Sequence, residues 1–483
     1  MQFDFLATNL EQALTSSFKQ MKDENWMGKM ATTSKRRNAA ITRWDLTSTS
    51  KTLGILVLAL AVGSCGRSSR EPVTLSYFRL GWSQPDELPT AQPLAQQFTR
   101  ETGIRLKNLP VPEDTLNQLD LSRKLLESKA GPDVVNIDLI WSGTLEENLV
   151  DLRPYLADEI SLLEPQLLTS YIVNGKLIAI PYQVQVGVLE YRTDLLRQYG
   201  YDHPPQTWDE LESMAERIQS GERAKGRKDF WGYVWQGAES EALTCNALEW
   251  QVAAQGGQIV EDDRTISVNN PGAIRAWQRA RHWIGWISPP SVVAYRELDS
   301  MNVFDTGGAA FARVWGGVIG GATRGRIEQS GLIHLRNSLP ASKTGYTSIA
   351  GGPGGRAGTL GGSGLAISRH SAHLQESVQL VRFLIRAQVR EAEENAASSL
   401  SQYPEIREVP PVLEEKTQHK NGIVIRPSNL TGSQYEEVAK AYMGAVHSVL
   451  TGQKAAPEAA AALEKQLTKM TGFHRGPPPK TAD

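Results

Sequence analysis

The sequence predicts an α/β fold with two lobes, and two observations lead to that prediction. Segments that alternate like strands are followed by segments with helical spacing, an order typical of a parallel sheet covered by helices. Roughly 400 residues follow a leader-like segment that ends at residue 64, which is more than a single hydrophobic core usually supports. We therefore expect the mature chain to be divided between two lobes.

The first strand and helix are expected soon after residue 72. The segment VTLSYF, from Val73 to Phe78, alternates as a half-buried strand does. Leu94, Ala95 and Phe98 then repeat at helical spacing before Gly103, a residue type that often ends helices.

A second pair follows the first. Helical spacing over Leu116–Lys129 stops at Gly131 and Pro132. The apolar run Asp133–Trp141, with the sequence DVVNIDLIW, predicts a buried strand that leads to a helix start.

Capping residues mark helix starts further along the chain. Thr207 and Glu210 have the spacing of a capping box, for a helix that is expected to end near Gly221. Asn270 before Pro271 predicts the start of another helix.

The last predicted helix has the same capping-box pattern. Ser433 and Glu436 precede an apolar face, and Gly452 is the expected stop. The Pro-rich, polar end of the chain, residues 473–483, predicts a disordered tail.

Residues 1–64 are predicted to form an N-terminal extension and a lipoprotein signal peptide. The basic run Lys35–Arg37 precedes an apolar core, Leu53–Val62, that is too short to span a bilayer. The residues before Cys65 resemble the bacterial lipobox, in which this Cys is acylated. We expect a periplasmic or extracytoplasmic protein, lipid-anchored to a bacterial membrane through Cys65; an ordinary cleaved signal with a chance Cys is the alternative.

Composition excludes some classes of function. A net charge of -2 argues against a nucleic-acid partner, which would require a basic face. Cys65 and Cys245 are the only cysteines, so no disulfide framework is expected. The count of 12 Trp suits a core, and it also suits a protein that stacks indole rings on sugars.

The Gly-rich segment 351–364, GGPGGRAGTLGGSG, has to be tested as a phosphate-binding loop. It lacks both the Gly-Lys-Ser/Thr ending and a GxGxxG that opens a helix after a strand. We expect a mobile loop or hinge that leads into LAIS.

Several segments, in their order, resemble the extracellular solute-binding proteins of family 1. These are lipoprotein receptors of sugar ABC importers, and the likeness is to their trehalose/maltose-binding group. It runs from about Val73 to Gly472 and includes the following strings: GPDVVNIDLIW, DLRPYL, GKLIAIPYQVQVGVLEYRTDLL, AAQGGQIVEDDRTISVNNPGAIRAW, GGAAFARVWGG, LGGSGLAISRHS and RPSNLTGSQYEEVAKAYMGAVHSVLTG.

The resemblance implies a two-lobed periplasmic-binding-protein clamp with discontinuous lobes and three hinge crossings. The crossings are expected near Pro181–Val186, Arg313–Gly316 and Gly361–Ser368. Lobe 1 would combine 72–181 with 315–365, and lobe 2 would combine 182–314 with 366–483.

The resemblance also implies function and partners. A monomer would capture a di- or oligosaccharide, trehalose or maltose first among the candidates, with no cofactor and no metal. It would deliver the sugar to ABC permease transmembrane subunits driven by a cytoplasmic ATPase.

Sugar sites combine groups that bond hydroxyls with flat aromatic faces. By position in the family's motifs, Asp138, Tyr182, Trp315 and Arg426 are candidates for this chain. A helix or turn cap is the alternative for Asp138, packing of a crossing strand for Tyr182, a core position for Trp315 and a surface ion pair for Arg426.

Further candidates are Glu249, Gln185, Gly362 and Ser363. Glu249 lies on the helix before AAQGG, and with Trp250 it is a candidate to line the cleft. Many relatives have Asp at the position of Gln185 and an aromatic residue at that of Ser363. These departures leave the identity of the sugar open.

The rival classes are a secreted carbohydrate-active enzyme, such as a glycoside hydrolase, and an adhesive lipoprotein. The Gly361–Gly364 string lacks the spacing of a nucleophile elbow. His370 and His373 have no HExxH context for zinc. The acidic run 261–263 lacks the ligand spacing of an EF-hand and reads as an exposed hairpin turn.

Overall fold

The computed structural model describes residues 72–78, 91–109, 115–128, 131–163, 165–318, 327–329, 343–402 and 422–479. The predicted signal peptide and Cys65 lie outside the described residues. In the described part of the chain, no helix combines the length and apolar character needed to cross a membrane.

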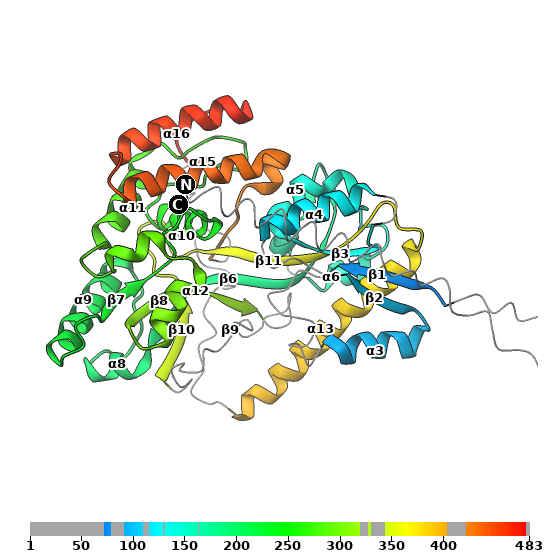
Figure 1. Ribbon diagram of the computed structural model, residues 1–483, viewed down its shortest axis with the longest axis horizontal. Coiled ribbons are helices and arrows are strands. Elements are labelled where there is room, and N and C mark those ends of the chain that lie inside the picture. Colours follow the sequence, from blue (N-terminus) through cyan, green and yellow to red (C-terminus); the bar gives the residue numbers. More distant parts are fainter. Residues whose placement is uncertain are drawn as a thin grey trace, which may run out of the picture. The chain divides into compact units, whose positions relative to one another are not determined.

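One mixed sheet runs through the described protein (Figure 1). Its two ends are parallel, as the sequence predicts, because β1 pairs in parallel with β2 and β3, and β7 pairs in parallel with β8. Its centre is antiparallel, which the strand–helix alternation did not predict. The strands along the sheet are, in order, β2 (Arg105–Leu109), β1 (Thr74–Phe78), β3 (Val134–Asp138), β11 (Gly358–Ile367), β6 (Ile180–Arg192), β8 (Ala309–Val318) and β7 (Trp231–Val234).

Shorter strands extend this sheet at three places. β10 (Thr344–Ser348) pairs with β6, β12 (Ile423–Val424) with β11, and β9 (Ile327–Gln329) with β8. A separate hairpin joins β4 (Ile172–Val173) to β5 (Lys176–Leu177).

The hydrophobic residues form two core clusters. The first is built mainly from residues 75–188 and 360–385. Its helices are α3 (Ala91–Thr102), α4 (Thr115–Glu127), η1 (Leu139–Trp141), α5 (Ser142–Leu145), η2 (Glu146–Asn148), α6 (Ala157–Ser161), α7 (Pro165–Thr169) and α13 (Leu374–Gln402).

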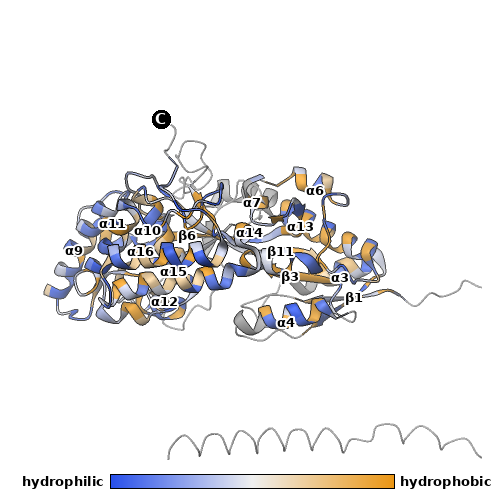
Figure 2. Ribbon diagram, turned by 90° about the horizontal axis from the view of Figure 1, so that it is seen from above, coloured by the Kyte–Doolittle hydropathy of each residue, from blue (hydrophilic) through white to orange (hydrophobic). Residues whose placement is uncertain are grey.

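The second cluster is built mainly from residues 189–292 and 424–467. The hydropathy of its helices alternates between hydrophilic and hydrophobic residues, as in α9 and α16 (Figure 2), which is typical of helices with one buried face. These helices are α8 (Thr193–Gln198), α9 (Trp208–Ala224), α10 (Glu241–Ala253), α11 (Pro271–Trp283), η3 (Pro290–Ala294), α14 (Ser428–Thr431), η5 (Gly432–Gln434), α15 (Tyr435–Leu450) and α16 (Ala456–Thr471). The helix α12 (Glu297–Asp305) instead packs with the first cluster through Met301 and Phe304.

Most predicted helix starts are confirmed by their caps. The Asn270 side chain accepts from two backbone N–H groups of the first turn of α11, and Thr207 accepts from the N–H of Glu210. The helix α9 ends at Ala224, close to the predicted end near Gly221, and Gly221 itself lies against the ring of Tyr199. α15 begins at Tyr435, and no side-chain cap is formed by Ser433.

The three predicted crossings fall on three adjacent strands. Pro181–Val186 lies in β6 and Arg313–Gly316 in β8, while Gly361–Ser368 begins in β11 and ends just beyond it. The Gly-rich segment therefore differs from the expected loop, since its second half, from Gly358, is buried strand.

The division of residues between the two clusters differs from the expected lobe boundaries. β11 ends beside β3, where Ile367 pairs with Val134. The next helix, α13, therefore packs with the first cluster. Figure 1 shows α13 beside α3. Phe383 of α13 packs on Phe98 of α3, with ring centroids 5.3 Å apart. Residues 366–385 thus pack with the first cluster, and Ile349, next to β10, packs with the second.

The predicted disordered tail is ordered over much of its length. The Ile266 N–H donates to the His474 carbonyl, and Thr265 Oγ1 lies 2.6 Å from His474 Nε2. These contacts hold the chain after α16 against the turn at residues 261–266, and residues 480–483 lie outside the described part.

Candidate functional site

The central strands β6, β8 and β11 bring most of the predicted ligand residues together. On β8, Trp315 pairs in register with Gly187 of β6. Gln185 of β6 lies between Gly361 of β11 and Gly317 of β8. Residues more than a hundred positions apart in the sequence therefore share one region of the sheet.

Trp315 is half-buried, and its ring is held from two sides. The guanidinium carbon of Arg313 lies 4.1 Å from the ring centroid, within the range of a cation–π contact. A methyl group on Gly361 would come within 2.7 Å of the ring. The indole is thus fixed on strand β8 with part of its surface exposed, as a stacking platform requires.

Glu249 lies in the core beside this platform. Its Oε1 is 2.7 Å from Arg313 Nη2, and both side chains are fully buried. The same oxygen accepts from the Thr359 N–H at 3.0 Å. Burial alone would lower the pKa of Arg313, but the nearby Glu249 carboxylate raises it. In this structure Glu249 therefore supports the Arg313–Trp315 pair and has almost no surface to offer a ligand.

The strand β11 is irregular at Gly362 and Ser363. Gly362 has φ +110°, and a methyl group there would come 1.9 Å from the Gln183 carbonyl. A bulge follows between Ser363 and Gly364. Ser363 is buried, and its hydroxyl donates to Gln183 Oε1 at 3.1 Å. The exposed Gln183 is thereby oriented on the same face of β6 as the half-buried Gln185. Tyr182 is half-buried and packs against the first core cluster, the packing role that the sequence left open.

Asp138 lies at the end of β3 and caps η1. Its carboxylate accepts from the Ile140 N–H at 3.1 Å, which is the capping role left open by the sequence. Burial raises the pKa of Asp138, and the positive charge of Arg426 opposes that rise. Asp138 also pairs in register with Ser363 across β3 and β11.

Arg426 is buried and already engaged, rather than free to bond two sugar hydroxyls. Its Nη1 donates to Glu241 at 2.9 Å and its Nη2 to the Leu360 carbonyl at 3.2 Å. Tyr435 donates to the same Glu241 carboxylate. The predicted alternative, an ion pair, is therefore formed, but in the interior and not at the surface.

Three residues of this region carried no signal in the sequence. Glu241 and Tyr435 complete the Arg426 network, and the Tyr171 ring lies where a methyl group on Gly364 would approach it within 2.9 Å. Glu241 is the first residue of α10, but nothing local indicates that it meets a residue 185 positions away.

A metal-binding cluster, a reactive thiol or an exposed group of acids would indicate catalysis or ion binding. Within the described ranges, no cluster of three or more His, Cys, Asp or Glu side chains could hold a metal ion. Cys245 is buried, and burial raises the pKa of its thiol to about 12, so the thiolate is strongly disfavoured. In the acidic run, Glu261 is buried and bonded to Ser267, while Asp262 and Asp263 are exposed at a turn.

Comparison with known sequences matches the chain to one family. The model of the bacterial extracellular solute-binding protein family covers residues 81–391. The chain belongs to this family. A relative from Deinococcus radiodurans, described as a probable ABC transporter-binding protein, is 37% identical over 426 residues, which are 86% of this chain and 98% of the relative.

Solved structures of this family confirm the predicted two-lobed clamp fold. A maltose-bound structure of T. maritima MalE3 is 28% identical, covers 82% of this chain and 100% of its own, and superposes with a TM-score of 0.67. A solute-binding protein from Thermotoga lettingae bound to α-D-tagatose is 22% identical, covers 83% and 100% of the two chains, and has a TM-score of 0.66.

Proposed function

We propose that this member of the solute-binding family is the substrate-binding component of a carbohydrate ABC importer. The observation that carries the proposal is Trp315, a half-buried indole fixed by Arg313 on a central strand among polar side chains. A flat aromatic face beside amide groups suits a sugar ring, whose C–H face is apolar and whose hydroxyls both donate and accept.

The residues of the proposed site divide into two roles. Trp315 stacks on the sugar ring, Tyr182 adds a second aromatic side chain, and Gln185 and Asp138 bond hydroxyls. The pairing of Gln185 with Gly361 and of Asp138 with Ser363, both on β11, supports this grouping. The ligand is a di- or oligosaccharide of the trehalose or maltose type. The maltose in the related MalE3 structure supports this choice.

Closure of the lobes and delivery to a permease complete the proposed cycle. The name of the D. radiodurans relative supports an ABC transporter as the partner. The loaded clamp would dock on transmembrane subunits driven by a cytoplasmic ATPase. Acylation of Cys65 would keep it at the membrane; a Cys65→Ser variant that still fractionates with membranes would contradict that anchor.

Calorimetric titration tests which sugar the protein binds. Purified protein is titrated with trehalose, maltose, sucrose and longer maltodextrins, and saturable binding of at least one sugar is expected. Trp315→Ala should abolish it. Trp231→Ala is the matched control, because Trp231 is also half-buried and lies under a guanidinium, with Arg223 4.3 Å from its ring centroid. Hydrolysis of a bound sugar by the pure protein would instead support the secreted carbohydrate-active enzyme.

A further inference from the structure

A pocket lies within the second core cluster, apart from the residues of the proposed sugar site. It has a volume of about 400 Å³, within the range of pockets that hold small molecules. It opens between the start of α9, the end of α10, one face of α11 and the loop before β11. Nothing in the proposed function uses it.

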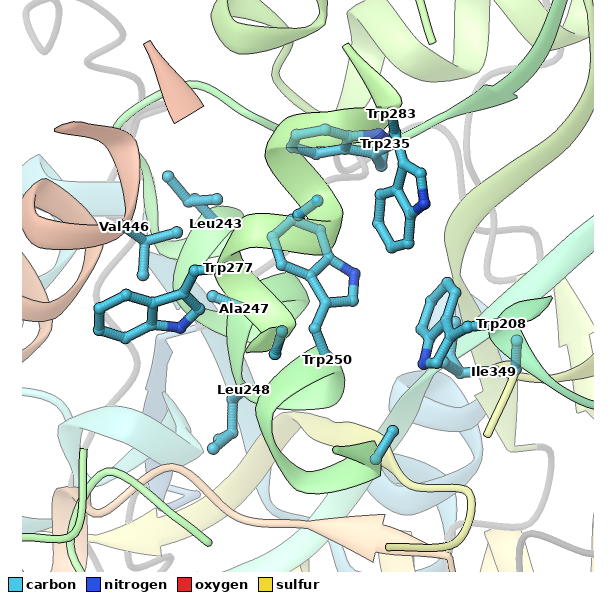
Figure 3. Close-up of a cluster of buried hydrophobic side chains, with 14 of the residues drawn as sticks. Trp208, Trp235, Leu243, Ala247, Leu248, Trp250, Trp277, Trp283, Ile349 and Val446 are labelled. Atoms are coloured by element: carbon cyan, nitrogen blue, oxygen red, sulfur yellow. The ribbon is translucent and has the colours of Figure 1, made fainter. Parts of the chain in front are cut away.

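Three indole rings, each at most 3% exposed, border this pocket on its inner side. Trp208 of α9, Trp250 of α10 and Trp283 of α11 line it. Figure 3 shows the three rings grouped around one region beside α10. The ring centroid of Trp283 lies 5.1 Å from that of Trp208 and 5.5 Å from that of Trp250. Such walls suit a planar, apolar body.

Two of these residues, Trp208 and Trp250, have an indole N–H with no hydrogen-bond acceptor in the described protein. Trp208 is only 3% exposed. A buried donor without a partner costs free energy. The neighbouring Trp283 differs, since its Nε1–H donates to Glu212 at 2.6 Å. An occupant of the pocket with an acceptor group would satisfy Trp208.

The rim supplies one uncommitted positive charge. Arg279 is paired with Asp209 and Glu212. Arg275, one helical turn before Arg279 on α11, is exposed and has no ion pair or hydrogen bond to any residue that the structure describes. An anionic group at the rim would pair with it.

The acceptors around the pocket are already in use. The carbonyl of Ala253 accepts from Gly354, that of Gly352 from Gly355, and that of Pro353 from the Gln255 side chain. Oδ1 of the Asp209 carboxylate accepts from Arg279. A neutral sugar needs acceptors for its hydroxyl protons, whereas a carboxylate only accepts. The polar groups that remain free therefore favour an anion.

We propose that this pocket binds a small planar organic carboxylate. Its ring lies against Trp208 and Trp250, which the fully buried Trp283 supports from behind, and its carboxylate accepts from Arg275 and from the Trp208 indole N–H. The site is separate from that of the proposed sugar and does not depend on it.

Titration of the purified protein with 1-naphthoate, followed by calorimetry, tests the proposal, with neutral 1-naphthalenemethanol as the comparison ligand. Saturable, submillimolar binding of naphthoate is expected, and at least tenfold weaker binding of the alcohol. Arg275→Ala should weaken naphthoate binding about tenfold, since a bond to a charged group contributes roughly that factor. Trp208→Phe, which keeps the ring but removes the N–H, should weaken it several-fold.

Two control variants distinguish this site from others. Arg197→Ala removes an exposed arginine of α8 and should leave naphthoate binding unchanged. Trp315→Ala should also leave it unchanged, even where it abolishes sugar binding. Absence of saturable binding, equal binding of the alcohol, or a loss in Trp315→Ala but not in Arg275→Ala would overturn the proposal.

Discussion

The carboxylate of Glu249 and the guanidinium of Arg313 form an ion pair in which both side chains are completely buried, with Oε1 2.7 Å from Nη2. The pair joins α10 to the central strand β8, and Arg313 in turn lies over Trp315. Gly187 of β6 makes room for it, because a methyl group there would come 2.0 Å from Glu249 Oε1. A charged pair in the core thus lies behind the proposed stacking platform.

Removing one member of this pair should be strongly destabilising. Glu249→Ala leaves Arg313 buried without its counter-ion, and the expected loss is about 3–5 kcal/mol in the free energy of unfolding, measured by urea denaturation. The double variant Glu249→Met, Arg313→Met should recover much of that loss, since no uncompensated charge remains. Glu437→Ala, which breaks an exposed pair with Lys440, should cause no measurable loss. A single variant as stable as the wild type would contradict this account.

Glu190 should make the protein less stable as the pH rises towards neutrality. Burial raises the pKa of Glu190 from 4.5 to about 7. The hydrogen bond from Tyr346 opposes this rise, and the negative charge of Asp305 adds to it. The folded state therefore keeps a proton that the unfolded chain loses, and stability falls between about pH 4.5 and about pH 7. A shift of this size corresponds to at most about 3 kcal/mol.

The variant Glu190→Gln isolates this effect. Its amide oxygen can still accept from Tyr346, whose hydroxyl lies 2.8 Å from Glu190 Oε1. The variant should match the wild type near pH 4.5 and exceed its stability above pH 7, in thermal melts across the pH range. The exposed Glu127→Gln should show no such crossover. If both variants follow the wild-type pH profile, the buried carboxyl of Glu190 does not cause the loss of stability between about pH 4.5 and about pH 7.

Glu222 should stabilise the folded protein at neutral pH and lose this effect in acid. Burial opposes ionisation, but bonds from Lys225, Arg227, Tyr199 and Gln198 prevail and lower its pKa to about 2. Its contribution to stability is fully present above about pH 4.5 and is lost as the pH falls towards 2. Glu222→Gln should therefore be less stable than the wild type at pH 6, and the difference should shrink in acid. A difference that stays constant with pH would show that only packing was changed.

Local signals in the sequence predicted the elements better than the site. Asn270 before Pro271 fixes the start of α11 because the cap is formed within three residues. The Glu249–Arg313 pair joins residues 64 positions apart and the Arg426–Glu241 pair joins residues 185 apart. Such pairs depend on the order of strands in the sheet, which periodicity does not contain. The same reason explains why the sequence places residues 366–483 together in lobe 2, although the pairing of β11 with β3 brings α13 against the first cluster.

Gly362 should tolerate no side chain, for two separable reasons. Its φ of +110° disfavours other residues, and a methyl group would come 1.9 Å from the Gln183 carbonyl, a backbone atom that cannot turn away. Gly103, with φ +74° and open space around its Cβ position, carries only the first penalty. Gly103→Ala should cost about 1 kcal/mol, and Gly362→Ala clearly more, in urea denaturation. Because β11 and β6 would have to separate at this point, Gly362→Ala should also weaken sugar binding, whereas Gly103→Ala should not. Equal losses of stability in the two variants would mean that β11 can shift away from β6 without cost, and the close approach of the two strands would then have no part in shaping the site.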